Sequence, residues 1–208
     1  MAKDLRKMRL YVLLTSSVAR RPLGEMARSV LAGGADALQL REKNASDREL
    51  LRLGQELRRL TAEAGAFLFV NDRPDIARLV EADGVHVGQD DLPLESARQL
   101  MGDERWVGVS THSVEQARAA AEADYIGVGP MYPTATKGYT EGVGPELVAA
   151  VRAVTSRPIV AIGGMTPERV GPILEAGATA VAVCSAIVAQ ANVEAATRDF
   201  RRAIEAAR

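Results

Sequence analysis

The largest group of chemically useful side chains follows an apolar segment in the second half of the sequence. Tyr125–Val128 leads through a glycine and a proline into a loop that carries Thr134, Ala135, Thr136 and Lys137. Glycine lets the backbone come close to a ligand, threonine hydroxyls donate hydrogen bonds, and a lysine ammonium supplies a compact positive charge. We therefore predict that this loop holds a phosphate group.

Three polar residues at alternate positions end another apolar segment, Ala37–Leu40. Gln39, Arg41 and Lys43 share one face if the segment is a strand, because successive strand side chains point to opposite faces. An arginine fork and a lysine ammonium together suit a diphosphate. A strand end that emerges into solvent is the alternative interpretation, since charged residues are common there.

Carboxylates follow two successive apolar segments. Asn71 and Asp72 come directly after residues 67–70, and Asp91 comes shortly after residues 84–87. Mg²⁺ is typically bound through one or two carboxylates, with waters and substrate phosphates filling its other positions. The sequence therefore predicts a Mg²⁺ site, although each aspartate is also placed to cap the helix expected after it.

Small residues and hydroxyls end the remaining segments. Ser110 is interpreted as a hydrogen-bond donor to a substrate, because the second glycine of a G-x-S-x-G nucleophile elbow is missing around it. Gly164, Cys184 and Ser185 follow the last two apolar segments, where a backbone turn and a helix N-terminus can bind a phosphate monoester. No base stands near Cys184 in the sequence, so a nucleophilic thiol is not expected. His86 is interpreted as a structural residue, since no second histidine stands at metal-ligand spacing.

The elements that must position these residues are indicated by hydrophobic periodicity as alternating strands and helices. The predicted strands are Leu10–Leu14, Ala37–Leu40, Ala66–Val70, Gly84–Val87, Trp106–Ser110, Tyr125–Val128, Ile159–Ile162 and Ala180–Val183. The predicted helices are Leu23–Ala32, Asp47–Ala64, Asp75–Ala82, Leu94–Met101, Val114–Ala123, Pro145–Val154, Pro167–Ala176 and a last one from about Ser185 to Ala207. The expected helix N-caps are Ser46, Ser113 and Thr166.

Repeated strand and helix units predict a single α/β domain over residues 1–208. Segments 31–40, 119–128 and 174–183 share one rhythm of helix end, turn and strand. Such units close as a (β/α)8 TIM barrel or lie open as a doubly wound sheet. We favour the barrel, because no G-x-G-x-x-G turn opens the first helix. In a barrel of near-minimal length, functional groups should lie at the C-terminal ends of the strands.

The composition is that of a globular protein rather than of a nucleic-acid or membrane binder. Of the 208 residues, 47% are hydrophobic and 25% are charged, and the formal net charge is −1. Binding to nucleic acid or to an anionic membrane requires a basic surplus, so neither partner is expected. The lone Cys184 excludes an intrachain disulfide, and Leu10–Leu14 is too short for a signal-peptide core or a membrane span. A cytoplasmic location is therefore expected.

The polar clusters, taken in order, closely resemble those of the thiamine phosphate synthase family. The resemblance runs from about Tyr11 to Ile187 and rests on Gln39-x-Arg41-x-Lys43, Asn71-Asp72, Gly84-Val85-His86-x-Gly88-Gln89-x-Asp91, Ser110-Thr111-His112, Pro133-Thr134-x-Thr136-Lys137, Gly163-Gly164 and Ser185-Ala186-Ile187. Any one motif is weak, but the ordered series is specific. One departure is Cys184, where many members of the family have an aliphatic residue.

The resemblance implies an enzyme that joins 4-amino-2-methyl-5-hydroxymethylpyrimidine diphosphate to a thiazole phosphate or its 2-carboxylate, giving thiamine phosphate and diphosphate. It implies Mg²⁺ as cofactor, held by Asp72 and Asp91. The implied catalytic residues are Arg41, Lys43, Ser110 and Lys137. The implied substrate-binding residues are Gln39, Leu40, Arg41, Glu42, Lys43, Asn71, Ser110, Thr134, Ala135, Thr136, Lys137, Gly164, Cys184 and Ser185. The implied chemistry is dissociative, with diphosphate leaving before the thiazole nitrogen attacks, so no protein nucleophile is expected.

Other functions fit parts of the pattern. A thiazole tautomerase-like barrel would need no diphosphate site or Mg²⁺, and the cluster of cations and carboxylates counts against it. A sugar-phosphate epimerase or isomerase would need an acid and a base poised for proton abstraction. A noncatalytic phosphate-ligand sensor is a third alternative, because a fold does not fix a function. The sequence leaves open whether the protein is a homo-oligomer, which thiazole phosphate it prefers, how the loop 131–144 closes, and what the Cys184 side chain does.

Overall fold

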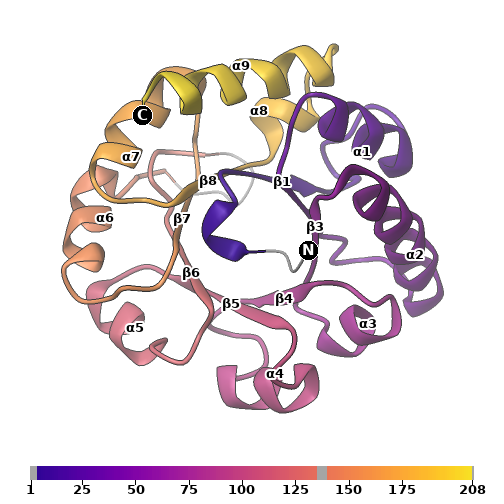
Figure 1. Cartoon of the computed structure of the whole chain (residues 1–208), viewed down its shortest axis with the longest axis horizontal. Coiled ribbons are helices and arrows are strands. Elements are labelled where there is room, and N and C mark those ends of the chain that lie inside the picture. Colours follow the sequence, from indigo (N-terminus) through magenta and orange to yellow (C-terminus); the bar gives the residue numbers. More distant parts are fainter. Residues whose placement is uncertain (1–3, 135–139, 208) are drawn as a thin grey trace.

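Parallel strands close into a barrel at the centre of the molecule, with helices around it (Figure 1). The computed structural model describes residues 4–134 and 140–207. The strands in this part are β1 (Leu10–Leu14), β2 (Ala37–Leu40), β3 (Phe67–Asn71), β4 (Gly84–Val87), β5 (Trp106–Thr111), β6 (Tyr125–Val128), β7 (Ile159–Ile162) and β8 (Ala180–Val183). β1 pairs with both β2 and β8, so the sheet is closed. The predicted (β/α)8 barrel is confirmed, and an open doubly wound sheet is excluded because its outer strands would each have one neighbour.

Apart from η1, which precedes β1, the helices follow the strands and cover the outside of the barrel. They are η1 (Leu5–Lys7), α1 (Leu23–Ala32), α2 (Asp47–Ala64), α3 (Pro74–Leu79), α4 (Leu94–Met101), α5 (Val114–Ala119), α6 (Gly144–Arg152), η3 (Pro167–Arg169), α7 (Val170–Glu175), α8 (Ser185–Val188) and α9 (Val193–Ala206). Their apolar faces pack against the outward-facing residues of the strands in one continuous core. Among the described residues, no helix is both long enough and apolar enough to cross a membrane.

Local hydrogen bonds explain where the helices differ from the predicted ones. Ser46 and Ser113 accept hydrogen bonds from backbone N–H groups three residues later, as expected of N-caps. Thr166 makes no such bond, and η3 replaces the first turn of the helix predicted there. The predicted last helix is divided into α8 and α9, because the Asn192 side chain accepts a hydrogen bond from the Ala195 N–H and starts a new helix. α3 and α5 end earlier than predicted.

The inside of the barrel is a second core, in which a cluster of aromatic side chains fills the lower half. Tyr11, Phe69 and Tyr125 are buried there, with ring centroids 5.2 to 6.3 Å apart. Glycines on neighbouring strands provide the room for these rings: a Cβ added to Gly108 would lie 2.1 Å from the Tyr125 ring, and one added to Gly84 would lie 2.7 Å from Phe69. The lower barrel is therefore filled, and open space is confined to its upper end.

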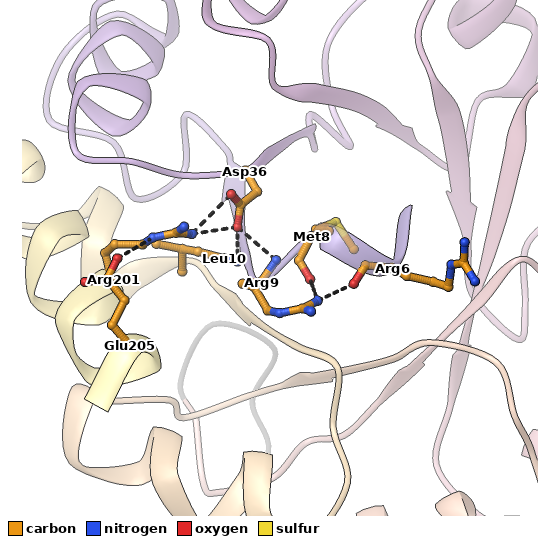
Figure 2. A network of polar contacts seen from close by, with 7 residues as sticks. All are labelled: Arg6, Met8, Arg9, Leu10, Asp36, Arg201 and Glu205. Atoms are coloured by element: carbon orange, nitrogen blue, oxygen red, sulfur yellow. Dashed lines mark hydrogen bonds and ion pairs between the residues drawn. The ribbon is translucent and has the colours of Figure 1, made fainter. Parts of the chain in front are cut away.

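A short segment before β1 closes the lower opening of the barrel. Figure 1 shows η1, in indigo, across the middle of the ring of strands. Leu5 and Met8 of this segment are buried in the inner core. The Arg9 guanidinium donates hydrogen bonds to the carbonyl oxygens of Arg6 and Met8, which fixes η1 against the start of β1 (Figure 2).

Aspartates directly before β2, β4 and β6 clamp each of these strands to the strand before it. Asp83, before β4, shows the arrangement: its Oδ2 accepts a hydrogen bond from the Leu68 N–H of β3 at 2.7 Å, and its own N–H donates to the Leu68 carbonyl at 2.9 Å. Arg58 of α2 pairs with the same carboxylate at 2.8 Å. Each clamp thus joins two strands and one outer helix at the N-terminal end of the barrel.

The same arrangement recurs around the barrel. Before β6, Asp124 accepts from the Val107 N–H of β5 at 2.7 Å and pairs with Arg98 of α4. Before β8, Thr179 takes the equivalent place, and its hydroxyl accepts from the Ile159 N–H of β7 at 3.2 Å. The repeat seen in the sequence therefore has a structural basis, because the residue before each even-numbered strand must satisfy the first N–H groups of its neighbour.

Asp36, before β2, extends the clamp to the last helix (Figure 2). Its carboxylate accepts hydrogen bonds at 2.9 Å from the N–H groups of Arg9 and Leu10, and pairs at 2.9 Å with Arg201 of α9. Glu205 holds the other side of the Arg201 guanidinium at 3.2 Å. Burial raises the pKa of Asp36 although these partners act against the rise. One side chain therefore joins β1, β2 and α9.

We predict that Asp83→Ala lowers the free energy of unfolding by about 2–4 kcal/mol, because it leaves the Leu68 N–H and the largely buried Arg58 guanidinium without their partner. Urea unfolding would measure this as a lower midpoint with an unchanged slope.

The matched control is Glu63→Ala, which removes an exposed ion pair with Arg59 on the same helix as Arg58. It should change the free energy of unfolding by less than about 0.5 kcal/mol. An equal loss in both variants would contradict the role assigned to the clamp.

Candidate active site

One cavity with two connected parts opens at the C-terminal ends of the strands. The larger part, of about 480 Å³, is called the carboxylate lobe, and its walls include Gln39, Arg41, Lys43, Asn71, Asp72, Asp91 and Ser110. The smaller part, of about 80 Å³, is called the glycine lobe, and its walls include Arg41, Ser110, Gly129, Thr134, Gly164, Cys184 and Ser185. Arg41 and Ser110 are among the residues that line both lobes, so the two spaces adjoin at the top of the barrel.

Asp72 and Asp91 face each other in the carboxylate lobe. Asp72 has a left-handed backbone with φ of 61°, and its N–H donates to the His86 carbonyl at 2.8 Å, which turns the side chain into the cavity. The Lys43 ammonium lies 3.3 Å from the Asp72 carboxylate. Asp91 accepts a hydrogen bond from the Gly88 N–H at 2.8 Å. Neither α3 nor α4 has a side-chain cap, so the helix-capping interpretation of these aspartates is wrong.

The proximity of the two carboxylates changes their protonation. Burial, together with the neighbouring Asp91, raises the pKa of Asp72. Burial acts in the same direction on Asp91, but hydrogen bonds from Asp72 and the Gly88 N–H lower the pKa of Asp91 overall. Two like charges this close are stable only if they share a proton or face a cation. A hard divalent cation, which prefers carboxylate oxygens, fits this pair.

Few other described side chains near Asp72 and Asp91 could serve as metal ligands. Among residues 4–134 and 140–207, no group of three or more His, Cys, Asp or Glu side chains is placed to hold a metal ion. Asn71, whose amide oxygen is a further neutral ligand type, lines the same lobe. The donor set is therefore a carboxylate pair with an amide nearby.

Strand periodicity divides residues 39–43 between the cavity and the outside of the barrel. Gln39 is 2% exposed and lies inside, and Arg41 and Lys43 line the carboxylate lobe. Leu40 packs in the outer core, and the Glu42 carboxylate accepts hydrogen bonds from Ser16 outside the cavity. The side chains of Leu40 and Glu42 thus lie away from both lobes, and substrate binding by these two residues stays a prediction.

Hydrogen bonds cross the barrel below the carboxylate lobe and link two of the predicted site residues. Gln39 Nε2 donates to Tyr11 Oη at 2.7 Å, and Tyr11 Oη lies 3.3 Å from Tyr125 Oη. His86 Nδ1 lies 3.0 Å from Tyr125 Oη, and His86 Nε2 lies 2.9 Å from Ser110 Oγ. His86 is therefore bonded on both ring nitrogens, as expected of a structural histidine, but it contacts a residue that lines the site.

Sequence reasoning missed Tyr11 and Tyr125 as parts of this site. Both occupy inward-facing positions on strands that are otherwise aliphatic or glycine, and each brings a hydroxyl into the barrel. A tyrosine on an otherwise aliphatic strand could have indicated a polar contact inside the barrel, because a buried phenol needs a hydrogen-bond partner. The strands that supply these partners could not be identified before the barrel was known.

The glycine lobe is bounded by two turns that pack on each other. Gly163 and Gly164 have φ of 103° and 60°, and a Cβ on Gly164 would lie 2.7 Å from the Pro133 carbonyl oxygen. The Tyr132 N–H donates to the Gly163 carbonyl at 3.1 Å, which attaches the loop after β6 to the turn after β7. Thr134 lies at the end of this attached loop. The predicted site residues Ala135, Thr136 and Lys137 lie outside the described residues.

Arg169, in η3, joins these two turns from the outside and was not identified from the sequence. Its guanidinium donates a hydrogen bond to the Gly164 carbonyl and lies over the Tyr132 ring, 4.3 Å from the ring centroid. Its position shortly after the glycine pair was the only signal in the sequence. Arg169 thus positions the backbone that borders the glycine lobe.

Cys184 and Ser185 close the far side of the glycine lobe. Cys184 directly precedes α8, and Ser185 is its first residue, so the N-terminal end of α8 borders this lobe. On the opposite side, His112 Nδ1 donates to the Gly129 carbonyl at 2.5 Å, and the His112 N–H donates to Gln116 Oε1 at 2.7 Å. His112 therefore supports the loop after β6.

Known proteins of one family are similar to this chain in sequence and in structure. A family model described as thiamine monophosphate synthase matches residues 10–187. A thiamine-phosphate synthase from Moorella thermoacetica is 47% identical over 203 residues, covering 96% of this chain and 97% of that protein. One from Natronomonas pharaonis is 46% identical over 192 residues, covering 90% of each. A solved structure of a thiamine phosphate pyrophosphorylase from Pyrococcus furiosus has a TM-score of 0.91 and 37% identity, covering 98% of this chain and 99% of that one.

The raised pKa of Asp72 predicts that Asp72→Asn stabilises the metal-free protein at about pH 7. The ionised Asp72 carboxylate is less favourable in the folded than in the unfolded state, so stability is lost as pH rises from about 4 through the folded-state pKa. Asparagine keeps the left-handed backbone and removes the repulsion. Urea unfolding with a chelator should show a gain near pH 7 that shrinks toward about pH 3.

Asp75→Asn is the matched control, because its change in stability near neutral pH should have the opposite sign. Hydrogen bonds from Arg73 lower the pKa of Asp75, so its ionised form is favourable in the folded state and its loss should reduce stability near neutral pH. A loss of stability in Asp72→Asn as well would contradict the repulsion between Asp72 and Asp91.

Proposed function

The chain belongs to the thiamine monophosphate synthase family and is a transferase, and from this premise we propose that it condenses 4-amino-2-methyl-5-hydroxymethylpyrimidine diphosphate with a thiazole phosphate. The products are thiamine phosphate and diphosphate. The observation that carries the proposal is the pairing of two lobes in one cavity. One lobe has cations beside a carboxylate pair, and the other has a glycine turn beside a helix N-terminus.

The carboxylate lobe suits the diphosphate. Arg41 and Lys43 enter it from one strand end, and their charges match the phosphate oxygens of a leaving group with several negative charges. Asp72 and Asp91 would hold Mg²⁺ there, and a bound Mg²⁺ would supply further charge to stabilise the departing diphosphate. Lys137, which the family resemblance adds to this set, lies outside the described residues.

The buried polar groups between the two lobes suit the pyrimidine ring. Gln39 and Ser110 hold their amide and hydroxyl in fixed positions, and Asn71 stands beside them at the lobe wall. A planar ring placed here would keep its methylene carbon between the diphosphate in one lobe and the thiazole nitrogen in the other. In this placement the diphosphate leaves from one side of the methylene carbon, and the thiazole nitrogen attacks from the opposite side.

The glycine lobe suits the phosphate of the thiazole. The turn at Gly163 and Gly164 and the first turn of α8 bring backbone N–H groups to one small space, and Thr134 and Ser185 add hydroxyls. Cys184 needs only its backbone for such a site, so the aliphatic residue common at this place in the family is not required.

The proposed reaction proceeds by substitution at the methylene carbon of the pyrimidine. Its carbon–oxygen bond breaks, the electron pair leaves with the diphosphate, and the lone pair of the thiazole nitrogen forms the new carbon–nitrogen bond. No proton need be removed from that nitrogen, which is consistent with a cavity that presents cations and hydrogen-bond donors. The tautomerase-like and sensor alternatives need no carboxylate pair beside Arg41 and Lys43, so this lobe favours the synthase over both.

We expect Asp91→Asn to reduce thiamine phosphate formation from the two purified substrates by at least about 100-fold, because a lost metal ligand removes several kcal/mol of charge stabilisation. Product formation should also require added Mg²⁺ in the unaltered protein. Asp103→Asn, an exposed change of the same type, is the control and should retain activity. Absence of product with folded, unaltered protein would refute the synthase; full activity in Asp91→Asn would refute only the metal site.

A second prediction concerns the support of the glycine lobe. Arg169→Gln should raise the KM for thiazole phosphate about tenfold, since it removes a charge-assisted hydrogen bond and a cation–π contact from the Gly164 turn. The KM for the pyrimidine diphosphate should stay within about twofold. Steady-state kinetics with each substrate varied in turn would measure both, with the exposed Arg118→Gln as control. Parallel changes in the two constants would contradict the assignment of this lobe.

A further inference from the structure

Five side chains from five strands form one hydrogen-bonded chain across the barrel interior, here called the cross-barrel chain: Gln39, Tyr11, Tyr125, His86 and Ser110. They come from β2, β1, β6, β4 and β5 respectively. Only the two ends, Gln39 and Ser110, carry the substrate-binding role proposed above. The three inner members also line the carboxylate lobe, but the ion and phosphate binding proposed above gives them no role, so they need their own explanation.

The chemistry of Gln39 sets the direction of the first bond in the cross-barrel chain. Gln39 Nε2 carries only hydrogens, so it donates to Tyr11 Oη. The two tyrosine hydroxyls can each donate or accept. In the direction that continues from Gln39, Tyr11 donates to Tyr125, and Tyr125 donates to His86 Nδ1. A neutral imidazole that accepts at Nδ1 carries its hydrogen at Nε2. His86 therefore donates to Ser110 Oγ, and the Ser110 hydrogen is directed away from His86.

The surroundings hold the chain in place. Tyr11, Tyr125 and Gln39 are 1%, 0% and 2% exposed, so water cannot replace their partners. A Cβ on Gly127 would lie 3.1 Å from the His86 ring, which shows how closely the ring is enclosed. Gln89 Nε2 donates to the Ser110 carbonyl at 2.6 Å and fixes the serine backbone from the other side. Burial also raises the pKa of both phenols, so each keeps the hydrogen that the chain requires.

We propose that Tyr11, Tyr125 and His86 are positioning residues that direct the Ser110 hydroxyl hydrogen toward the substrate. The inference rests on the proposed function, in which an aminopyrimidine ring lies between Gln39 and Ser110. Such a ring has nitrogen atoms that only accept and an exocyclic amino group that donates. With its hydrogen directed away from His86, Ser110 favours a ring nitrogen over the amino group, and this preference orients the face and rotation of the ring.

The tautomers of the two histidines test this without any substrate. His112 Nδ1 faces a carbonyl, which can only accept, so His112 must carry its hydrogen at Nδ1. The cross-barrel chain requires the opposite tautomer, with the hydrogen at Nε2, for His86. Long-range ¹H–¹⁵N spectra at about pH 8, where histidines are neutral, should show one residue of each type. His112→Gln would assign the signals, because the chain has only two histidines.

Tyr11→Phe removes the hydroxyl that connects Gln39 to the other members of the cross-barrel chain, and it keeps the buried ring. Without the donor at its start, His86 should change from a single Nε2–H tautomer to a mixture of both. His86 in the Nδ1–H form in the unaltered protein would overturn the proposal. A His86 tautomer that does not change in Tyr11→Phe would overturn it as well, because Gln39 would then not set the direction.

Kinetics test whether the direction matters to the substrate. Tyr125→Phe and Tyr11→Phe should each raise the KM for the pyrimidine diphosphate about tenfold, as expected for a misdirected hydrogen bond, and leave the KM for thiazole phosphate within about twofold. Thr61→Val removes another fully buried hydroxyl, on α2, and should change neither constant. Unchanged or parallel constants in the tyrosine variants would refute the positioning role.

Failure of this inference and failure of the proposed function can be distinguished. If the unaltered protein forms no thiamine phosphate, the synthase is refuted and the positioning role toward its substrate is refuted with it, whatever the tautomers. If product forms but the histidine tautomers or the KM values differ from those expected, only the cross-barrel chain is refuted.

Discussion

Closure of the barrel depends on how the lower ends of its strands are satisfied. A strand begins with N–H and carbonyl groups that a parallel neighbour must meet, and parallel pairing leaves these groups unpaired where one strand starts before the next. Asp36, Asp83 and Asp124 solve this by placing a carboxylate under the first N–H groups of the preceding strand and an arginine under the carboxylate. Each unit of two strands is thereby fixed to an outer helix, and the ring of strands has a defined register. The cavity at the opposite end depends on that register.

The contents of the barrel change from apolar to polar along its axis. Rings fill the lower half, and the inner glycines of β4 and β5 supply the space that these rings need. The next inward-facing positions along β2, β3, β4 and β5 hold Gln39, Asn71, His86 and Ser110, and charged residues follow at the C-terminal ends of the strands. The phenols of Tyr11 and Tyr125 lie at the boundary, with their rings in the apolar layer and their hydroxyls in the polar one. The binding groups are therefore supported from below by packed rings rather than by solvent.

Much of this arrangement could be predicted from the sequence where local periodicity was sufficient. Gln39, Arg41 and Lys43 share a face because alternation is a local property, and the carboxylates of Asp72 and Asp91 meet because consecutive strands are neighbours. The Tyr125 hydroxyl could not be paired with His86 or Tyr11 in advance, since β6 is not adjacent to β4 or β1 and the contacts cross the barrel. Arg169 acts on a carbonyl and a ring through long-range contacts that no local pattern encodes. The division of the last helix was missed because Asn192 was not recognised as a cap.

The ion pair of Asp36 with Arg201 spans 165 positions of the chain, and this separation bears on how the barrel is made during translation. β1 emerges from the ribosome first, yet one of its two neighbours, β8, and the arginine that completes its clamp are synthesised near the end. Until then β1 keeps an unpaired edge, and the inner side of Tyr11 and Leu13 lacks the far wall of the barrel. The nascent chain therefore passes through a long interval in which the first strand of the barrel lacks one of its two neighbours.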